Sequence, residues 1–84
     1  MNPRPIPRSF AEPVCGALAA VIRQRRQQTG LSLNQLAART NLSHPMIRFI
    51  ETGARIPTID SAARISRALG VPLSQLLREA ERQI

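Results

Sequence analysis

Apolar residues recur at helical spacing through most of the chain, and no segment sustains the apolar–polar alternation of a half-buried strand. Leu18, Val21 and Ile22 follow i, i+3, i+4 spacing within a segment that ends at Gly30. This pattern predicts a first amphipathic helix over about 14–30.

Two short helices are predicted from their N-caps. Ser32 and Gln35 have the spacing of a capping box, which predicts a helix over 33–40. Ser43 is a favoured N-cap residue and predicts a second helix over 44–52. About three residues join the two helices. This is the spacing of a helix-turn-helix, which presents its second helix to the major groove of DNA.

The remaining elements follow from turn residues and caps. Asn41 tolerates the left-handed conformation of a tight turn, and Gly53 is placed to end the second short helix. Thr58 caps a fourth helix that stops before Gly70, and a fifth helix covers about 73–84. We therefore expect an all-α fold with five helices.

The first thirteen residues differ from the rest of the chain. Residues 1–13 contain four of the seven prolines, which predicts an extended arm, with Pro13 at the entrance of the first helix. We expect one domain over 14–84. The arm carries Arg4 and Arg8 and either enters a minor groove, packs across a second subunit or stays disordered.

Charge is the strongest compositional feature. The chain has 84 residues, enough for one small domain, and its net charge is +7. All twelve basic residues are arginine. Residues 14–57 hold six of them against the single acid Glu51, a net charge of +5. This excess suits a polyanionic partner, although a charged surface also serves solubility.

Other residue types exclude several classes of protein. One cysteine, Cys15, and one histidine are too few for a disulfide framework or a structural zinc site, so we expect no metal and no cofactor. There are no paired carboxylates and no supported nucleophile, so we do not expect an enzyme. No segment has the length of a membrane span or the form of a signal peptide, and we expect a cytoplasmic protein.

Between Leu18 and Leu77, a set of residues follows the order and spacing of a known family pattern, with no insertion. It comprises the stretch Leu18 to Arg26, Leu36-Ala37, Leu42-Ser43, Ile47, Ile50-Glu51-Thr52-Gly53, Pro57, Ile65, Ala68-Leu69-Gly70-Val71 and Leu76-Leu77. In these residues the chain resembles the Cro/C1-type (XRE-like) helix-turn-helix family. The resemblance implies a five-helix, lambda-repressor-like DNA-binding domain.

The resemblance also implies roles for individual residues. Arg26 and Glu51 match a pair that forms a structural salt bridge between the first and third helices. Base contacts are implied at the start and on the outer side of the 44–52 helix, at His44, Pro45, Arg48 and Phe49. We expect Arg48 to read guanine. Phe49 either packs on thymine methyls or deoxyribose, or is an aromatic at the core edge or at a subunit contact.

Phosphate contacts are expected around this helix, at Arg23, Arg25, Asn34, Gln35, Arg39, Ser43 and Arg55. The sequence departs from the family pattern at three places, one of which is Arg48, where a small serine or a polar residue is frequent. Leu33 stands where a phosphate-binding glutamine is frequent, so that contact moves to Asn34 or Gln35. Asn41 stands where the turn has glycine. These departures leave in place the docking mode that the resemblance implies.

The last helix has an apolar edge that needs to be covered. Leu73, Leu77, Ala80 and Ile84 follow i, i+4, i+7, i+11 spacing, while Leu76 turns towards the core. A homodimer through this edge would place two recognition helices about 34 Å apart on a near-palindromic operator. The alternative is that residues 80–84 fray.

These features predict a small transcriptional regulator that binds double-stranded DNA, a repressor rather than an activator, controlled by its own concentration. An antitoxin and a restriction-modification controller share this size and pattern. A protein-interaction module that uses the basic face on an acidic partner is the alternative from a different class. A membrane-surface peptide fits less well, because the arginines do not lie opposite one continuous apolar face.

Overall fold

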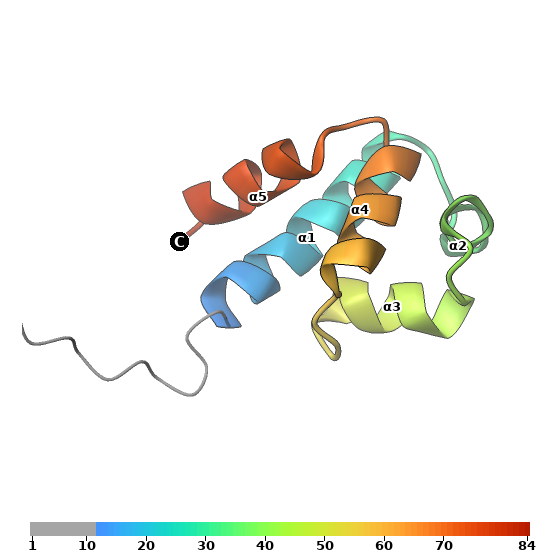
Figure 1. Cartoon of the computed structure of the whole chain (residues 1–84), viewed down its shortest axis with the longest axis horizontal. Coiled ribbons are helices and arrows are strands. Elements are labelled where there is room, and N and C mark those ends of the chain that lie inside the picture. Colours follow the sequence, from blue (N-terminus) through green and yellow to red (C-terminus); the bar gives the residue numbers. More distant parts are fainter. Residues whose placement is uncertain (1–11) are drawn as a thin grey trace, which may run out of the picture.

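The computed structural model describes residues 12–84, which form five α-helices and no strand (Figure 1). The helices are α1 (Glu12–Gln28), α2 (Leu33–Thr40), α3 (His44–Thr52), α4 (Ile59–Ala68) and α5 (Leu73–Arg82). The predicted all-α fold is confirmed. Of the predicted arm, residues 1–11 lie outside the described residues.

Two predicted boundaries differ from the structure. α1 begins at Glu12, two residues before the expected start, so Pro13 lies inside its first turn. Proline is tolerated there, because the first backbone N–H groups of a helix have no intrahelical acceptor. α5 ends at Arg82, so the last two residues do not extend it.

The other helix ends follow the predicted caps. The hydroxyl groups of Ser32, Ser43 and Thr58 each accept a hydrogen bond from the backbone N–H three residues later, at 3.0, 3.2 and 3.0 Å. Asn41 and Gly53 end α2 and α3 in the left-handed region, with φ of 58° and 79°. These short-range interactions explain why the ends of α2 and α3 can be located from sequence.

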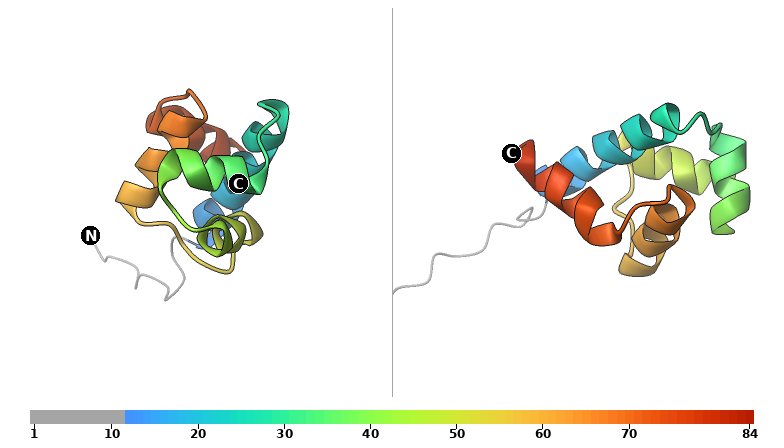
Figure 2. Two further views of the ribbon diagram at one scale, coloured as in Figure 1. Left: turned by 90° about the vertical axis from the view of Figure 1, so that its right-hand side faces the viewer. Right: turned by 90° about the horizontal axis from the view of Figure 1, so that it is seen from above.

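The apolar faces of all five helices meet in one core. α1 packs along α5 and also against α3, and α4 contacts both α2 and α5 (Figures 1 and 2). The largest fully buried side chains are Val21, Ile22, Leu36, Ile47, Ile50, Ile65 and Leu76. No helix within residues 12–84 is long and apolar enough to cross a membrane.

Candidate nucleic-acid interface

The angle between α2 and α3 is held by buried groups on both sides of the turn. Leu36 of α2 and Ile47 and Ile50 of α3 lie in the same core cluster, and each is at most 1% exposed. The buried hydroxyl of Thr40 donates to the carbonyl of Leu36 at 2.8 Å and accepts from the backbone N–H of Leu42 at 3.3 Å. One side chain therefore ties the end of α2 to the turn that leads into α3.

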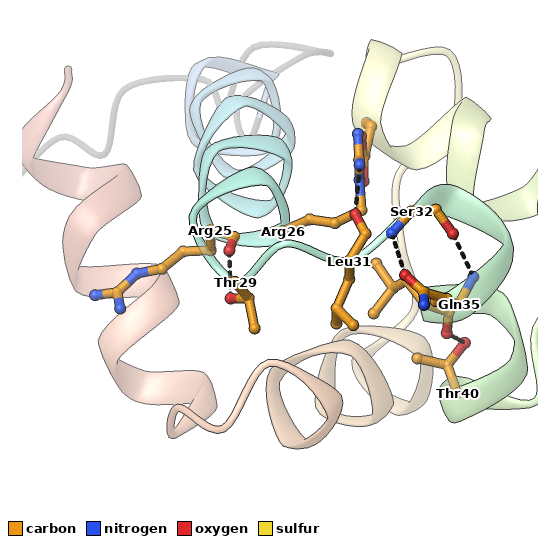
Figure 3. Close-up of polar contacts among 9 residues, drawn as sticks. Arg25, Arg26, Thr29, Leu31, Ser32, Gln35 and Thr40 are labelled. Carbon is orange, nitrogen blue, oxygen red and sulfur yellow. Dashed lines mark hydrogen bonds and ion pairs between the residues drawn. The ribbon is translucent and has the colours of Figure 1, made fainter.

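A buried ion pair attaches α3 to α1. Arg26 donates from Nε to Oε2 of Glu51 at 2.6 Å and from Nη2 to Oε1 at 3.0 Å. Its Nη1 donates to the carbonyl of Leu31 at 2.9 Å, and Figure 3 shows the side chain reaching from the end of α1 towards that carbonyl. The two side chains are only 12% and 5% exposed. The structure thus has the interhelical salt bridge that the resemblance implies.

The electrostatics of this pair keep Arg26 charged. The hydrogen bonds that Arg26 donates to Glu51 raise the pKa of Arg26 above its ordinary value, and this effect outweighs the lowering by burial. Both charges are satisfied within the fold, so the pair serves to position α3 and Glu51 adds no net negative charge to the face around it.

Three of the four predicted base-contact residues lie on the side of α3 that faces away from its buried isoleucines. Pro45, Arg48 and Phe49 are exposed, and His44 at the helix start is half-buried. Phe49 is 42% exposed, which is large for an aromatic side chain and excludes a place in the core of this subunit. These residues form the accessible surface of the predicted recognition helix.

The loop after α3 folds back onto that surface. The Arg55 guanidinium carbon lies 5.8 Å from the centre of the Phe49 ring, within the range of a cation–π contact. The backbone N–H of Arg55 also donates to the carbonyl of Phe49 at 3.1 Å. A predicted phosphate contact and a predicted base contact therefore lie side by side at one end of α3.

At the other edge of α3, Arg23 and Arg48 line one shallow groove with Leu33, the first residue of α2. The groove also includes Arg26 and Glu51, whose charges cancel. Two guanidinium groups, one on α1 and one on α3, thus face a common space, and neither forms an ion pair within the part of the chain that the structure describes. This arrangement favours an anion, and we call it the α1–α3 groove.

Three smaller polar residues complete the predicted phosphate contacts near α2 and α3. Asn34, Gln35 and Ser43 are all exposed. The Gln35 side-chain oxygen accepts from the backbone N–H of Ser32 at 2.8 Å, so its NH2 group is the part that can reach a phosphate (Figure 3). The Ser43 oxygen accepts from the N–H of Met46, which leaves its hydroxyl hydrogen as a donor.

Arg25 has a different environment from the one expected of a phosphate contact. It donates from Nη2 to both carboxylate oxygens of Glu79 on α5, at 2.8 and 2.9 Å, and from Nε to Oε1 at 3.1 Å. In Figure 3 its side chain points away from α2 towards the neighbouring helix. Its charge is paired inside the subunit, and we leave Arg25 out of the interface. Arg39 lies at the far end of α2, away from the α1–α3 groove.

The predicted dimer residues do not form one exposed edge. Ala80 is fully buried, so its prediction as a subunit contact is wrong. Leu73 and Leu77 are half-buried and line an apolar groove between the start of α1 and α5. Ile84 is 66% exposed and lies beyond the end of α5.

Two isoleucines that the sequence analysis did not single out lie on this apolar groove. Ile56, in the loop after α3, is 69% exposed, and Ile59, the first residue of α4, is 75% exposed. Large apolar residues beside Pro57 and Thr58, where a loop usually carries polar residues, were the available indication in the sequence. The groove is lined by Val14, Cys15, Leu18, Ile56, Pro57, Thr58, Ile59, Ala62, Leu73 and Leu77.

Comparison with known sequences finds helix-turn-helix proteins. A helix-turn-helix family model matches residues 22–76. The HTH-type transcriptional regulator SutR of Escherichia coli is 37% identical over 60 residues, which is 71% of this chain and 34% of that protein. The uncharacterized HTH-type transcriptional regulator Rv0474 of Mycobacterium tuberculosis is 38% identical over 50 residues, 60% of this chain and 36% of that protein. The chain thus spans about a third of the length of these curated relatives.

Solved structures of regulators have the same arrangement of helices. The clp gene regulator ClgR from Corynebacterium glutamicum matches with a TM-score of 0.79 and 27% identity, over 84% of this chain and 92% of that one. The restriction-modification controller protein C.Esp1396I matches with a TM-score of 0.74 and 26% identity, over 84% of this chain and 96% of that one. These likenesses agree with the five-helix fold described above.

Proposed function

Because this chain belongs to the Cro/C1-type helix-turn-helix family of DNA-binding transcriptional regulators, which are generally not enzymes, we propose that it binds double-stranded DNA sequence-specifically to regulate transcription. In this proposal α3 enters the major groove, where each base pair presents a distinct pattern of donors and acceptors.

The observation that carries the proposal is the exposed outer face of a helix whose inner face is fixed in the core. Pro45, Arg48 and Phe49 are exposed on α3, and Arg23 and Arg55 flank them. Arg48 is the proposed reader of guanine, through paired hydrogen bonds to O6 and N7 that discriminate by about 1–3 kcal/mol. The flanking arginines supply the contacts to phosphate that set orientation without reading sequence.

The test measures fluorescence anisotropy on duplexes that tile the gene's own upstream region, beside a scrambled duplex, at two salt concentrations. One tile should bind at least about 10³-fold more tightly than the scrambled duplex. Arg48→Ala should reduce this preference more than it weakens background binding. Arg78→Ala removes another exposed arginine, on α5, and should leave the preference intact.

Two results would count against the proposal. Equal, steeply salt-dependent binding to every duplex would indicate a binder without sequence preference. Absence of binding at low salt would favour the protein-interaction module, in which the basic face contacts an acidic partner.

The proposal includes a homodimer on a near-palindromic operator. Its support is the apolar groove with Ile56 and Ile59 on its rim, because exposed apolar surface of this kind is favourable to cover. Leu73 and Leu77, two of the four residues expected at a subunit contact, line the same groove, whereas Ala80 is buried in the core. A two-fold pair would present two α3 helices to half-sites about 34 Å apart.

The proposed regulatory effect is repression, in which bound protein blocks access to a promoter, including its own. A reporter gene behind the preferred tile should fall in expression when the protein is supplied, and a rise would indicate an activator. The likeness to C.Esp1396I favours a restriction-modification controller as a second candidate within the same class. The genes beside this one distinguish a controller from an antitoxin or another regulator.

A further inference from the structure

A second group of arginines lies at the C-terminal end of α2. Arg39 of α2 and Arg64 and Arg67 of α4 line one open recess, which Thr40, Asn41 and Ala68 complete. Of these three arginines, only Arg39 is expected from the sequence to contact phosphate. The structure brings this residue together with two arginines that lie 25 and 28 positions later in the chain. We call this site the α2–α4 recess.

Only one of the three arginines is paired within the described part of the chain. Arg64 donates from Nε to Oδ2 of Asp60 at 2.8 Å and from Nη1 to the carbonyl of Thr40 at 3.2 Å. Arg39 and Arg67 are exposed and form no ion pair within residues 12–84. Three arginines and one aspartate leave the recess with a net charge of +2.

A purely structural role accounts for part of this arrangement. Arg39 and Arg67 each lie in the last turn of a helix, where a positive charge is favourable beside the helix dipole. Arg64 holds the last carbonyl of α2 and so joins α4 to α2. The helix-dipole effect and the Arg64 hydrogen bond would both be present if Arg39 and Arg67 lay far apart. They do not explain why these two guanidinium groups, from different helices, line the same recess.

The position of the recess relative to α3 indicates what it contacts. α2 has eight residues, and a helix of that length is about 12 Å long. The α1–α3 groove with Arg23 and Arg48 lies at its first residue, and the α2–α4 recess lies at its last. In the left view of Figure 2, α2 crosses the molecule from the end of α1 to α4. The major groove of B-DNA is also about 12 Å wide, so the length of α2 is comparable with the width of the groove.

We propose that the α2–α4 recess is a second phosphate-binding site, which holds one backbone of the major groove while Arg23 holds the other. This inference rests on the proposed function, because it requires α3 to enter that groove. Arg39 and Arg67 supply the free donors, since a guanidinium group binds phosphate oxygens through paired, charge-assisted hydrogen bonds. Arg64 keeps the two helix ends together.

The test is the salt dependence of DNA binding by the double variant Arg39→Gln/Arg67→Gln, which leaves Arg64 and its hydrogen bonds in place. Each phosphate contact contributes about 0.9 to the slope of log K against log salt, so the slope should become less steep by about 1.8. When salt is raised from 50 to 200 mM, the affinity of both proteins for DNA should fall. The factor by which it falls should be about ten times smaller for the variant than for the unchanged protein. The preference for one tile over the scrambled duplex should remain, because phosphate contacts carry no sequence information.

The matched control is Arg78→Gln/Arg82→Gln, which removes the same charge from exposed positions on α5. Circular dichroism should show unchanged helix content in both variants, and the control should keep the unchanged protein's slope. An unchanged slope in the Arg39/Arg67 variant would overturn the inference and leave the recess to an acidic protein partner. An equal change in the control would also overturn it, by showing an effect of net charge alone. If the unchanged protein binds no duplex, the proposed function itself fails.

Discussion

At the scale of single residues, the role of each arginine is set by a partner that is distant in sequence. Arg25 and Arg26 are adjacent in the last part of α1, yet one pairs with Glu79 and the other with Glu51. Successive residues of a helix point about 100° apart, so neighbours face different elements. The family resemblance implies the pair of Arg26 with Glu51. No local sequence pattern predicts that Arg25 pairs with Glu79, which is 54 residues later in the chain.

Because Arg25 is paired with Glu79 and Arg23 lines the α1–α3 groove, we expect substitutions of these two α1 arginines to change different properties. Arg23→Gln should make the salt dependence of DNA binding less steep by about 0.9, because Arg23 lines the α1–α3 groove. Arg25→Gln should leave that slope unchanged and lower the free energy of unfolding by about 1 kcal/mol, since it breaks a partly exposed ion pair. Anisotropy titrations and urea unfolding measure the two quantities. A similar change of slope in both variants would show that Arg25 does contact the DNA.

The buried pair predicts a larger effect on stability. Glu51→Gln keeps the shape of the side chain but leaves the charge of Arg26 without its partner in a site where both side chains are nearly buried. The free energy of unfolding should fall by about 3 kcal/mol, as expected when one member of a buried ion pair is removed. Glu79→Gln is the matched control and should cost about 1 kcal/mol. Equal losses in urea unfolding would contradict the structural role given to Glu51.

At the scale of elements, the features that the sequence predicts correctly are those set by local contacts, such as the ends of helices. The start and end of α2 and α3 depend on caps within three residues, and those ends match the prediction. The side of α5 that faces the core depends on tertiary packing. Ala80 follows Leu76 by four residues, on the same helix face, and both are fully buried. The spacing of apolar residues from Leu73 onwards places Ala80 on the predicted subunit-contact face, whereas in the structure it lies on the core-facing side of α5.

The turn between α2 and α3 gives an element-scale prediction. Asn41 has a φ of 58°, a conformation that costs an L-residue with a branched side chain about 1–2 kcal/mol. Asn41→Val should therefore lower the free energy of unfolding by about that amount and weaken specific DNA binding, because the turn sets how α3 leaves α2. Asn41→Gly adopts the same φ without strain and should be as stable as the unchanged protein. The idea fails if both variants unfold at the same urea concentration.

At the scale of the whole molecule, the basic sites and the apolar groove have no lining residue in common. The basic sites lie at α3 and at both ends of α2, whereas the apolar groove lies between the start of α1, the start of α4 and α5. A small domain buries a limited fraction of its surface, and an apolar groove that it leaves exposed is favourable to cover with a second copy. Two copies related by a two-fold axis can each place rim isoleucines into the partner's groove, since such an interface uses the same patch twice.

This geometry predicts that Ile56→Gln/Ile59→Gln separates the dimer without unfolding the subunit. Both side chains are more than two-thirds exposed, so their replacement removes little from the core. Sedimentation at micromolar concentration should give a dimer for the unchanged protein and 9.3 kDa for the variant. On a duplex with two half-sites the variant should lose cooperative binding, while its affinity for one half-site stays the same. Ile84→Gln, an equally polar change outside the groove, should remain dimeric. A variant that sediments as a dimer would place the interface elsewhere, and a monomeric unchanged protein would remove the two-fold operator from the proposal.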